Sequence, residues 1–360
     1  MALGATQVSP QLAVYGAGAI GSQLGGRVHA AGYNVTLIEP WEPQRSAIQR
    51  DGITVHDSGT ETHYRPPVLA PSELPHLPGS IDILFLAVKS YDTLDALAVT
   101  QAYLAPDCLV VSMQNSINEE WIAPIIGGER VLGGVILING VLLEPGHVTA
   151  TPSVSQASAS ADLPGVYVGS YAAPAGERVI EVASIVDAAW PAVAIDDLLH
   201  ERWSKMVINT MINSVSGVSG LPSAEALAHP EARFVQIALA AEVLRVAEAE
   251  GHPVEVIMGD YSAQDMYDGA LGKSEVVSKG LGQRAALVGP EAKTSLLQDV
   301  LRGRRTESDY FAGLVAHKGR QHGLETPYCS AVTELMHQIE GGLLSPSPET
   351  LSEVRRLVEA

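Results

Sequence analysis

The stretch QLAVYGAGAIGSQLGGRVHAAGYNVTLIE, residues 11–39, decides the fold of this chain. It opens with a short apolar strand at 11–15 and passes through a glycine-rich turn into a helical stretch that runs to about Ala31. Gly32 ends that helix, and a second strand is expected at 33–39. A strand, a crossover helix and a second strand together predict a parallel βαβ unit.

Apolar runs further along the chain extend this sheet. Residues 81–88 and 108–113 are short continuous apolar runs of the kind buried inside parallel sheets, and 93–104 can form the helix between them. Residues 131–170 read as short strands broken by glycine and proline, and Ser153–Ala161 are predicted to form a surface loop. We therefore expect an α/β fold that begins with a Rossmann-type parallel-sheet domain.

The pattern becomes helical after Asp196. We predict that residues 1–198 form the Rossmann dinucleotide-binding domain and that residues 199–360 form an all-helical substrate and dimerisation domain. The Gly-, Ser- and Asp-rich segment 259–289 is predicted to be a mobile excursion between helices. Helices of the second domain are expected at 201–216, 231–250, 291–302, 306–322 and 329–339.

The glycines after the first strand have separate roles in a dinucleotide-binding loop. Gly16 permits a tight turn, Gly18 lets backbone amides approach a pyrophosphate, and Gly21 allows the helix to pack closely on the strand. The start of the helix then offers its partial positive charge to the phosphates. A purely structural turn is the alternative, but the βαβ setting favours a cofactor site. That predicted loop comprises Gly16, Ala17, Gly18, Ala19, Ile20 and Gly21.

Glu39 closes the second predicted strand, where an acidic side chain would accept hydrogen bonds from the adenosine ribose hydroxyls. A 2′-phosphate placed there would be repelled by about 4 kcal/mol as an upper figure, at ~4 Å and an effective dielectric of ~20. The residue therefore favours NAD(H), while Arg45 leaves NADP(H) possible. The alternative is that Glu39 is an ordinary solvated charge.

Three polar residues recur every four positions in an otherwise apolar helical segment. Lys205, Asn209 and Asn213 lie in HERWSKMVINTMINSVS, residues 200–216, and would form one stripe on an α-helix. Such a stripe needs partners, since an unsatisfied buried donor costs on the order of 1–3 kcal/mol. We interpret the stripe as the floor of an active site. The alternative is that Lys205 extends to water and the asparagines join helices.

Composition excludes several classes of protein. The chain has 41 acidic and 22 basic side chains, a net charge of −19 that would repel nucleic acid and anionic membrane surfaces. Its two cysteines, Cys108 and Cys329, have no CxxC spacing, so no disulfide framework, zinc cluster or other metal site is suggested. No signal peptide or membrane-spanning run is evident, and we expect a cytoplasmic protein.

The glycine loop, the Lys-x3-Asn-x3-Asn helix and the later segment SLLQDVLRGRRTESDY, residues 295–310, together resemble the ketopantoate reductase family. The resemblance extends from roughly Leu12 to Ile339. It implies a Rossmann domain, a helical domain, an active site in the cleft between them, and a homodimer. It also implies a nicotinamide cofactor and a small 2-oxo or 2-hydroxy acid as the substrate.

The resemblance also carries residue roles. It implies that Lys205 donates the proton to the ketone oxygen during hydride transfer, and that Glu307 pairs with that lysine. It implies that Asn209, Asn213 and Ser295 bind the 2-oxo acid, and that Lys89 and Asn115 lie at the cofactor side. An ammonium within hydrogen-bond reach can stabilise the charge that develops on the ketone oxygen. The alternative for Glu307 is a solvated acid at a helix start capped by Thr306.

The chain departs from the family pattern at two places. Ser223 stands where the family often has a substrate-binding Asn, and we expect it to bind the substrate too, with a shorter side chain that reaches a different part of the ligand. The chain is also longer than typical members, mainly in the segment 259–289. NADPH is the usual coenzyme of the family, and Glu39 argues against it. We therefore keep three hypotheses: a reductase of the ketopantoate type, a catabolic NAD-dependent dehydrogenase for another hydroxy acid or alcohol, and a nucleotide-sensing protein without turnover.

Overall fold

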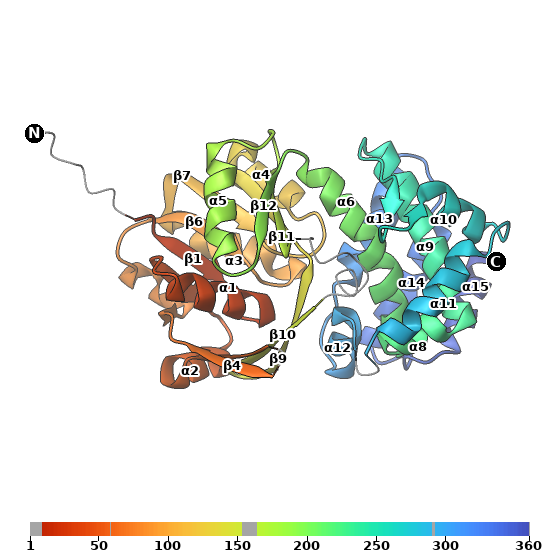
Figure 1. The fold of residues 1–360 in the computed structure, drawn as a ribbon, viewed down its shortest axis with the longest axis horizontal. Helices are drawn as coiled ribbons and strands as arrows, with labels where there is room; N and C mark the ends of the chain where they lie inside the picture. Colours follow the sequence, from red (N-terminus) through yellow and green to blue (C-terminus); the bar gives the residue numbers. More distant parts are fainter. Residues whose placement is uncertain (1–8, 58, 153–163, 290–291, 360) are drawn as a thin grey trace, which may run out of the picture. The chain divides into compact units, whose positions relative to one another are not determined.

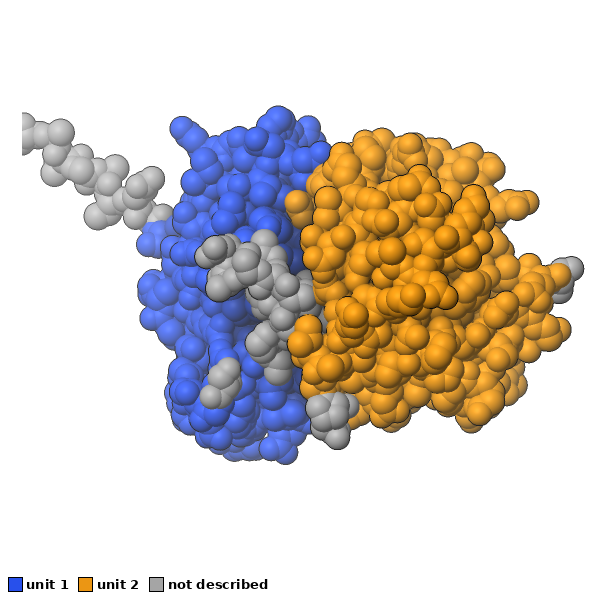
Figure 2. All heavy atoms as spheres, turned by 45° about the vertical axis from the view of Figure 1, so that its right-hand side comes forward, with its two compact units in different colours: residues 1–156, 162–198 blue, residues 157–161, 199–360 orange. Residues whose placement is uncertain are grey.

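The computed structural model describes residues 9–57, 59–152, 164–289 and 292–359. The chain divides into two compact units, of which one ends at Leu198 and the other continues from Leu199 (Figure 2). The predicted surface loop at Ser153–Ala161 lies outside the described residues. The first unit is built on β-sheets and the second mainly on helices (Figure 1).

The described part of the first unit contains an eight-stranded sheet in the order β12-β11-β8-β7-β6-β1-β2-β5. All neighbouring strands are parallel except β8 and β11, which are antiparallel. This arrangement confirms the predicted parallel βαβ opening and the Rossmann-type fold. The strands are β1 (Leu12–Tyr15), β2 (Val35–Ile38), β5 (Val68–Leu69), β6 (Ile81–Leu86), β7 (Leu104–Ser112), β8 (Val131–Ile136), β11 (Val166–Ser170) and β12 (Ala192–Ile195).

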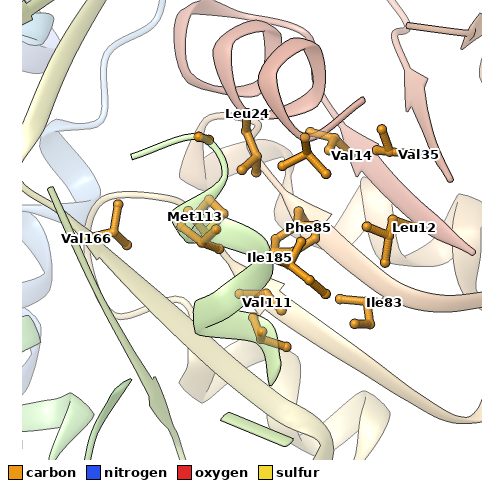
Figure 3. Packing of buried hydrophobic residues seen from close by; sticks show 14 of the residues in the cluster. Leu12, Val14, Leu24, Val35, Ile83, Phe85, Val111, Met113, Val166 and Ile185 are labelled. Atoms are coloured by element: carbon orange, nitrogen blue, oxygen red, sulfur yellow. The ribbon is translucent and has the colours of Figure 1, made fainter. Parts of the chain in front are cut away.

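Helices cover both faces of this sheet. Successive strand residues point to opposite faces, so Phe85 packs in a cluster with Leu24 of α1 and Ile185 of α5 (Figure 3). Leu84 packs with Leu97 of α3 on the other face. The continuous apolar runs of the strands therefore follow from burial on both sides. The helices are α1 (Ala19–Ala30), α2 (Glu42–Asp51), α3 (Thr93–Thr100), α4 (Glu119–Ile126) and α5 (Glu177–Asp187), with 3-10 turns at Pro71–His76, Ser90–Asp92, Gln101–Tyr103 and Gly128–Arg130.

A second, four-stranded sheet belongs to the same unit, and the sequence analysis did not predict it. Its strands run in the order β4-β3-β10-β9, with β3 and β10 parallel and the two outer pairs antiparallel. Val55 and Val148 of this sheet join the same buried cluster as Leu24 of α1. The sheet therefore packs next to the helix that follows the glycine loop. Its strands are β3 (Ile53–Asp57), β4 (Thr60–Tyr64), β9 (Ile138–Glu144) and β10 (His147–Pro152).

The second unit is organised around α9, a 20-residue helix with buried residues on most of its surface. No helix in the described ranges is long and apolar enough to cross a membrane. The helices are α6 (Leu198–Ile208), a π-helical segment (Asn209–Asn213), α7 (Ser214–Ser219), α8 (Ser223–Ala228), α9 (Pro230–Ala249), α10 (Ala263–Ala270), α11 (Val276–Arg284), α12 (Ser295–Leu301), α13 (Ala312–Gln321), α14 (Pro327–Glu340) and α15 (Thr350–Glu359), with 3-10 turns at Ala285–Leu287 and Ser308–Tyr310.

Several details of the second unit correct the predictions. The unit is helical but not all-helical, because β13 (Val256–Ile257) and β14 (Tyr261–Ser262) form a small antiparallel sheet. The segment 259–289 is more than a connection between helices, since it contains α10 and α11, which pack against α9. The helix predicted at 306–322 begins only at Ala312, because a 3-10 turn precedes it.

Candidate active site

The glycine loop of the first unit has the backbone geometry of a tight turn. Gly16 has φ +94°, and a Cβ atom there would lie 2.8–3.1 Å from atoms of Ala87 and Val88. A Cβ atom at Gly21 would lie 1.8 Å from the carbonyl oxygen of Gly16, so α1 packs directly on the loop. Both positions therefore need glycine, as the sequence predicts.

The start of α1 offers a site that suits an anion. Nothing lies within 4 Å of a Cβ atom built at Gly18, the N-cap residue, and no acidic residue occupies the first turn. The first N–H groups of a helix have no partner within the helix, so those of Ala19 and Ile20 suit a phosphate. The backbone here fits the pyrophosphate of a dinucleotide.

Glu39 is buried and is therefore not the solvated charge of the alternative interpretation. Its carboxylate accepts the backbone N–H of Ala17 at 2.5 Å and that of Trp41 at 2.7 Å. Burial raises the pKa of Glu39, and these two hydrogen bonds and the charge of Arg45 oppose that effect. The Arg45 guanidinium donates to the carbonyl oxygens of Glu39 (3.0 Å) and Pro40 (3.4 Å). Glu39 thus joins the end of β2 to the glycine loop.

Lys89 and Asn115 lie in the loops that follow β6 and β7, two adjacent parallel strands. Hydrogen bonds connect these loops: Gln114 Nε2 donates to Lys89 O at 3.4 Å, and Ser90 Oγ donates to Asn115 O at 3.2 Å. The loops therefore lie at the same edge of the sheet as the glycine loop, where ligands bind in open α/β sheets.

The polar stripe of the second unit contains a break in α-helical geometry. Residues 209–213 form a π-helical turn between α6 and α7. An α-helix turns about 100° per residue, so residues four apart drift by roughly 40° around the axis. The π turn has i→i+5 hydrogen bonds and holds more residues per turn, so the angular offset between Asn209 and Asn213 differs from that of a regular α-helix. π turns of this kind are frequent at functional sites.

The asparagines of the stripe are joined to Ser295 on α12. Asn213 Nδ2 donates to Asn209 Oδ1 at 3.5 Å, and Ser295 Oγ donates to Asn213 Oδ1 at 3.1 Å. The three side chains form a continuous polar row, and all three are partly exposed. The alternative interpretation is correct in one respect, because Asn213 does connect two helices.

Lys205 lies next to two other charged groups of the same unit. Burial, and secondly the like charge of Arg202, lower the pKa of Lys205 to about 7, whereas the carboxylate of Glu307 raises it. Glu307 is 2% exposed and precedes the 3-10 turn at Ser308–Tyr310. It is therefore not a solvated acid at a helix start. The structure brings together the ammonium and the carboxylate that the sequence analysis selected.

The sequences of both units match family models. Residues 12–157 match the family model "Ketopantoate reductase PanE/ApbA", and residues 197–340 match "Ketopantoate reductase PanE/ApbA C terminal". A 2-dehydropantoate 2-reductase of Archaeoglobus fulgidus is 30% identical over 332 residues, which cover 92% of this chain and 98% of that protein. The chain belongs to the ketopantoate reductase family. Membership makes it an NAD(P)-dependent oxidoreductase that acts on a CH–OH group.

Similarity to other relatives and to solved structures also extends over nearly the whole of both chains. A 2-dehydropantoate 2-reductase of Mesorhizobium japonicum is 29% identical, with 91% of this chain and 97% of that protein covered. A ketopantoate reductase structure from Ralstonia eutropha JMP134 has a TM-score of 0.72 at 24% identity, covering 92% and 99%. A structure of D-mandelate dehydrogenase with NADH and anilino(oxo)acetate has a TM-score of 0.75 at 23% identity, also covering 92% and 99%.

Ser223 is the one predicted substrate residue that the structure does not join to this group. It begins α8, is buried, and its backbone N–H donates to Ala292 O at 2.9 Å. No hydrogen bond within the described ranges connects it to Asn209, Asn213 or Ser295.

The sequence analysis missed three features of the site. Arg202 lies one turn before Lys205 on α6, and its i, i+3 spacing could have indicated its charge effect. Ser116 follows Asn115 in a left-handed conformation (φ +73°), which is uncommon for a non-glycine residue and has no signal in the sequence. Thr210 Oγ1 is buried without a hydrogen-bond partner in the part of the chain that is described.

Proposed function

We propose that this protein transfers hydride between a nicotinamide coenzyme and a 2-oxo or 2-hydroxy acid of the ketopantoate type. One observation carries the proposal: Lys205 and the buried Glu307 belong to the same unit, and burial lowers the pKa of Lys205 to about 7 although the charge of Glu307 raises it. Lys205 and Glu307 belong to two of the three motifs through which the sequence resembles the family. The polar row Asn209–Asn213–Ser295 lies on the same helical segment as Lys205 and on its neighbour α12.

In the proposed mechanism the protein binds the coenzyme, orients the acid and protonates the ketone oxygen. The glycine loop and the start of α1 would hold the pyrophosphate, and Lys89 and Asn115 would contact the nicotinamide end of the coenzyme. When bound, the coenzyme supplies or accepts the hydride. Asn209, Asn213 and Ser295 orient the acid, with Ser295 directed towards its carboxylate. Lys205 donates a proton to the ketone oxygen of the substrate in the reductive direction and accepts it back in the oxidative direction.

Glu307 supports the charged form of Lys205. Without a carboxylate nearby, burial would leave the lysine neutral at neutral pH and unable to donate. A pKa of about 7 lets the same group act as acid or base near neutrality. The proposed role of Glu307 is therefore to keep the proton of Lys205 available, and not to react itself.

A substrate panel tests this proposal. Steady-state rates are measured with NADH and NADPH against ketopantoate and other 2-oxo acids, and with NAD⁺ and NADP⁺ against the matching 2-hydroxy acids. The proposal expects at least one 2-oxo acid to be reduced with a kcat of the order of 1–10³ s⁻¹. It is wrong if the protein binds coenzyme but oxidises it with none of the acids.

A second candidate is an NAD-dependent dehydrogenase for a different 2-hydroxy acid. The buried Glu39 at the end of β2 and Ser223 at a position where the family often has Asn favour it. It predicts higher efficiency with NAD⁺ and a hydroxy acid than with NADPH and ketopantoate. The same panel separates the two candidates. We also propose that the protein is a homodimer in the cytoplasm.

We expect Glu39→Gln to shift coenzyme preference towards NADPH. The amide keeps an oxygen for the loop but removes the charge that would repel a 2′-phosphate, so the ratio of kcat/KM for NADPH to that for NADH should rise at least about tenfold. The ratio is the appropriate measurement, because Glu39 also accepts a hydrogen bond from the N–H of Ala17. Weakening that bond should reduce the binding of both coenzymes. An unchanged ratio would mean that Glu39 does not face the ribose.

A further inference from the structure

A buried glutamine connects the glycine loop to the second sheet. Gln44, on α2, is 1% exposed. Its Nε2 donates to Ala17 O at 2.7 Å and to Ser22 Oγ at 3.2 Å, while its Oε1 accepts the backbone N–H of Gly146 at 2.8 Å. Gly146 lies in the turn between β9 and β10. One side chain therefore bridges the loop and the tip of the β9–β10 hairpin.

A second glutamine, Gln23, connects α1 itself to the same sheet. Gln23 is fully buried, and its Nε2 donates to Ala19 O at 3.0 Å and to Thr149 O of β10 at 3.2 Å. A Cβ atom at Gly140 of β9 would lie 2.5 Å from this nitrogen, so a side chain there would displace the Gln23 carboxamide. The two glutamines attach the first turn of α1 and the loop before it to the same sheet.

Both backbone polar groups of Ala17, its N–H and its carbonyl oxygen, are hydrogen-bonded to side chains. Glu39 accepts the N–H of Ala17, and Ser22 Oγ donates to its carbonyl oxygen at 2.7 Å beside the bond from Gln44. A buried carboxamide that loses its partners costs on the order of 1–3 kcal/mol, so Gln44 is strongly held in this orientation. The loop is therefore fixed in one conformation before any ligand arrives, which lowers the cost of binding.

We propose that Gln44 is a positioning residue for coenzyme binding, through which the four-stranded sheet holds the glycine loop in its binding conformation. Gln23 has the corresponding role for the first turn of α1. This inference rests on the proposed dinucleotide site and adds a function for the second sheet. The sheet supplies no atom to the coenzyme in this proposal, and it acts on the loop through Gln44 and on the first turn of α1 through Gln23.

The test compares Gln44→Met with a matched buried glutamine. Met has a similar size but cannot make the three hydrogen bonds, so the Kd for NADH and NADPH should rise about tenfold. The Kd is measured by titrating the fluorescence of the reduced coenzyme, without substrate. The kcat at saturating coenzyme should change by less than about twofold, because the loop does not contact the reacting atoms.

Gln11→Met is the control. Gln11 is also buried and hydrogen-bonded, donating to Leu12 O at 3.0 Å and accepting from Asn34 Nδ2 at 2.8 Å, but it lies just before β1, at the opposite end of the strand from the loop. It should lose thermal stability without a change in the Kd for coenzyme. An equal rise in Kd in both variants would mean a general loss of stability and would overturn the positioning role.

A second variant keeps the test decisive if Gln44→Met does not fold. Gln44→Glu retains an oxygen for Gly146 but, when ionised, cannot donate to Ala17 O, so it should weaken coenzyme binding at least as much. An unchanged Kd in both Gln44 variants, with normal binding by the wild type, overturns the positioning role and leaves the proposed function intact. A wild type that binds neither coenzyme overturns both.

Discussion

Replacing Lys205 with alanine is expected to lower kcat for 2-oxo acid reduction by at least ~100-fold, since general acid catalysis of this kind typically contributes 10²–10⁴-fold. The ammonium is the proposed source of the proton that the ketone oxygen takes up, and the charges of Arg202 and Glu307 act on its pKa. The Kd for coenzyme should stay within about twofold, because a purely catalytic loss acts on the transition state.

The control for this variant is Lys279→Ala. Lys279 is an exposed lysine on α11 that pairs with Glu275 at 2.7 Å, and surface pairs of this type contribute only ~0.3–0.5 kcal/mol. Its removal should leave kcat and coenzyme binding unchanged. Comparable rates in Lys205→Ala and the wild type would remove Lys205 from the mechanism. A parallel loss of coenzyme binding would indicate a structural effect.

The largest effect on stability is expected for Glu242→Ala. Glu242 is a buried residue of α9 whose carboxylate accepts the backbone N–H groups of Tyr328 (2.9 Å) and Cys329 (2.8 Å), at the start of α14. Burial raises its pKa, and these hydrogen bonds oppose that effect. Alanine would leave a cavity and two N–H groups without this partner, that of Cys329 buried and that of Tyr328 partly buried, so the free energy of unfolding should fall by about 3–5 kcal/mol.

Two variants separate the causes of this loss. Glu242→Gln keeps one acceptor oxygen and the packing volume, so it should cost about 1–2 kcal/mol. Glu248→Ala removes an exposed glutamate of the same helix and should change stability by less than ~0.5 kcal/mol. Urea unfolding followed by circular dichroism measures all three. A loss for Glu242→Ala as small as that for Glu248→Ala would show that the carboxylate does not hold α14.

Local signals made much of the first unit predictable. The turn at Gly16, the close packing at Gly21 and the buried strands all follow from residue spacing and the position of glycine. The four-stranded sheet was missed because its strands pair across long separations, as β3 with β10, and β4 is exposed and polar. No periodic pattern marks such a strand.

The site was predictable in its residues but not in its geometry. The spacing of Lys205, Asn209 and Asn213 indicated a common stripe, yet the π turn that contains both asparagines cannot be read from a 3.6-residue period. Glu39 was selected as a ribose acceptor, but its hydrogen bond to Ala17 depends on a loop that is distant in sequence. Gln44 carries no sequence signal at all, because its partners lie on three separate segments.

The rate of hydride transfer to a 2-oxo acid as a function of pH tests the central claim most directly. Reduction needs the protonated lysine, so the single-turnover rate should be constant at low pH and fall as pH rises through about 7, the pKa of Lys205. Glu307→Gln should move this fall to lower pH, because it removes the charge that raises that pKa. In Lys205→Ala the residual rate should no longer depend on pH in this range. A fall near pH 7 that persists in Lys205→Ala would assign the proton to another group and contradict the account.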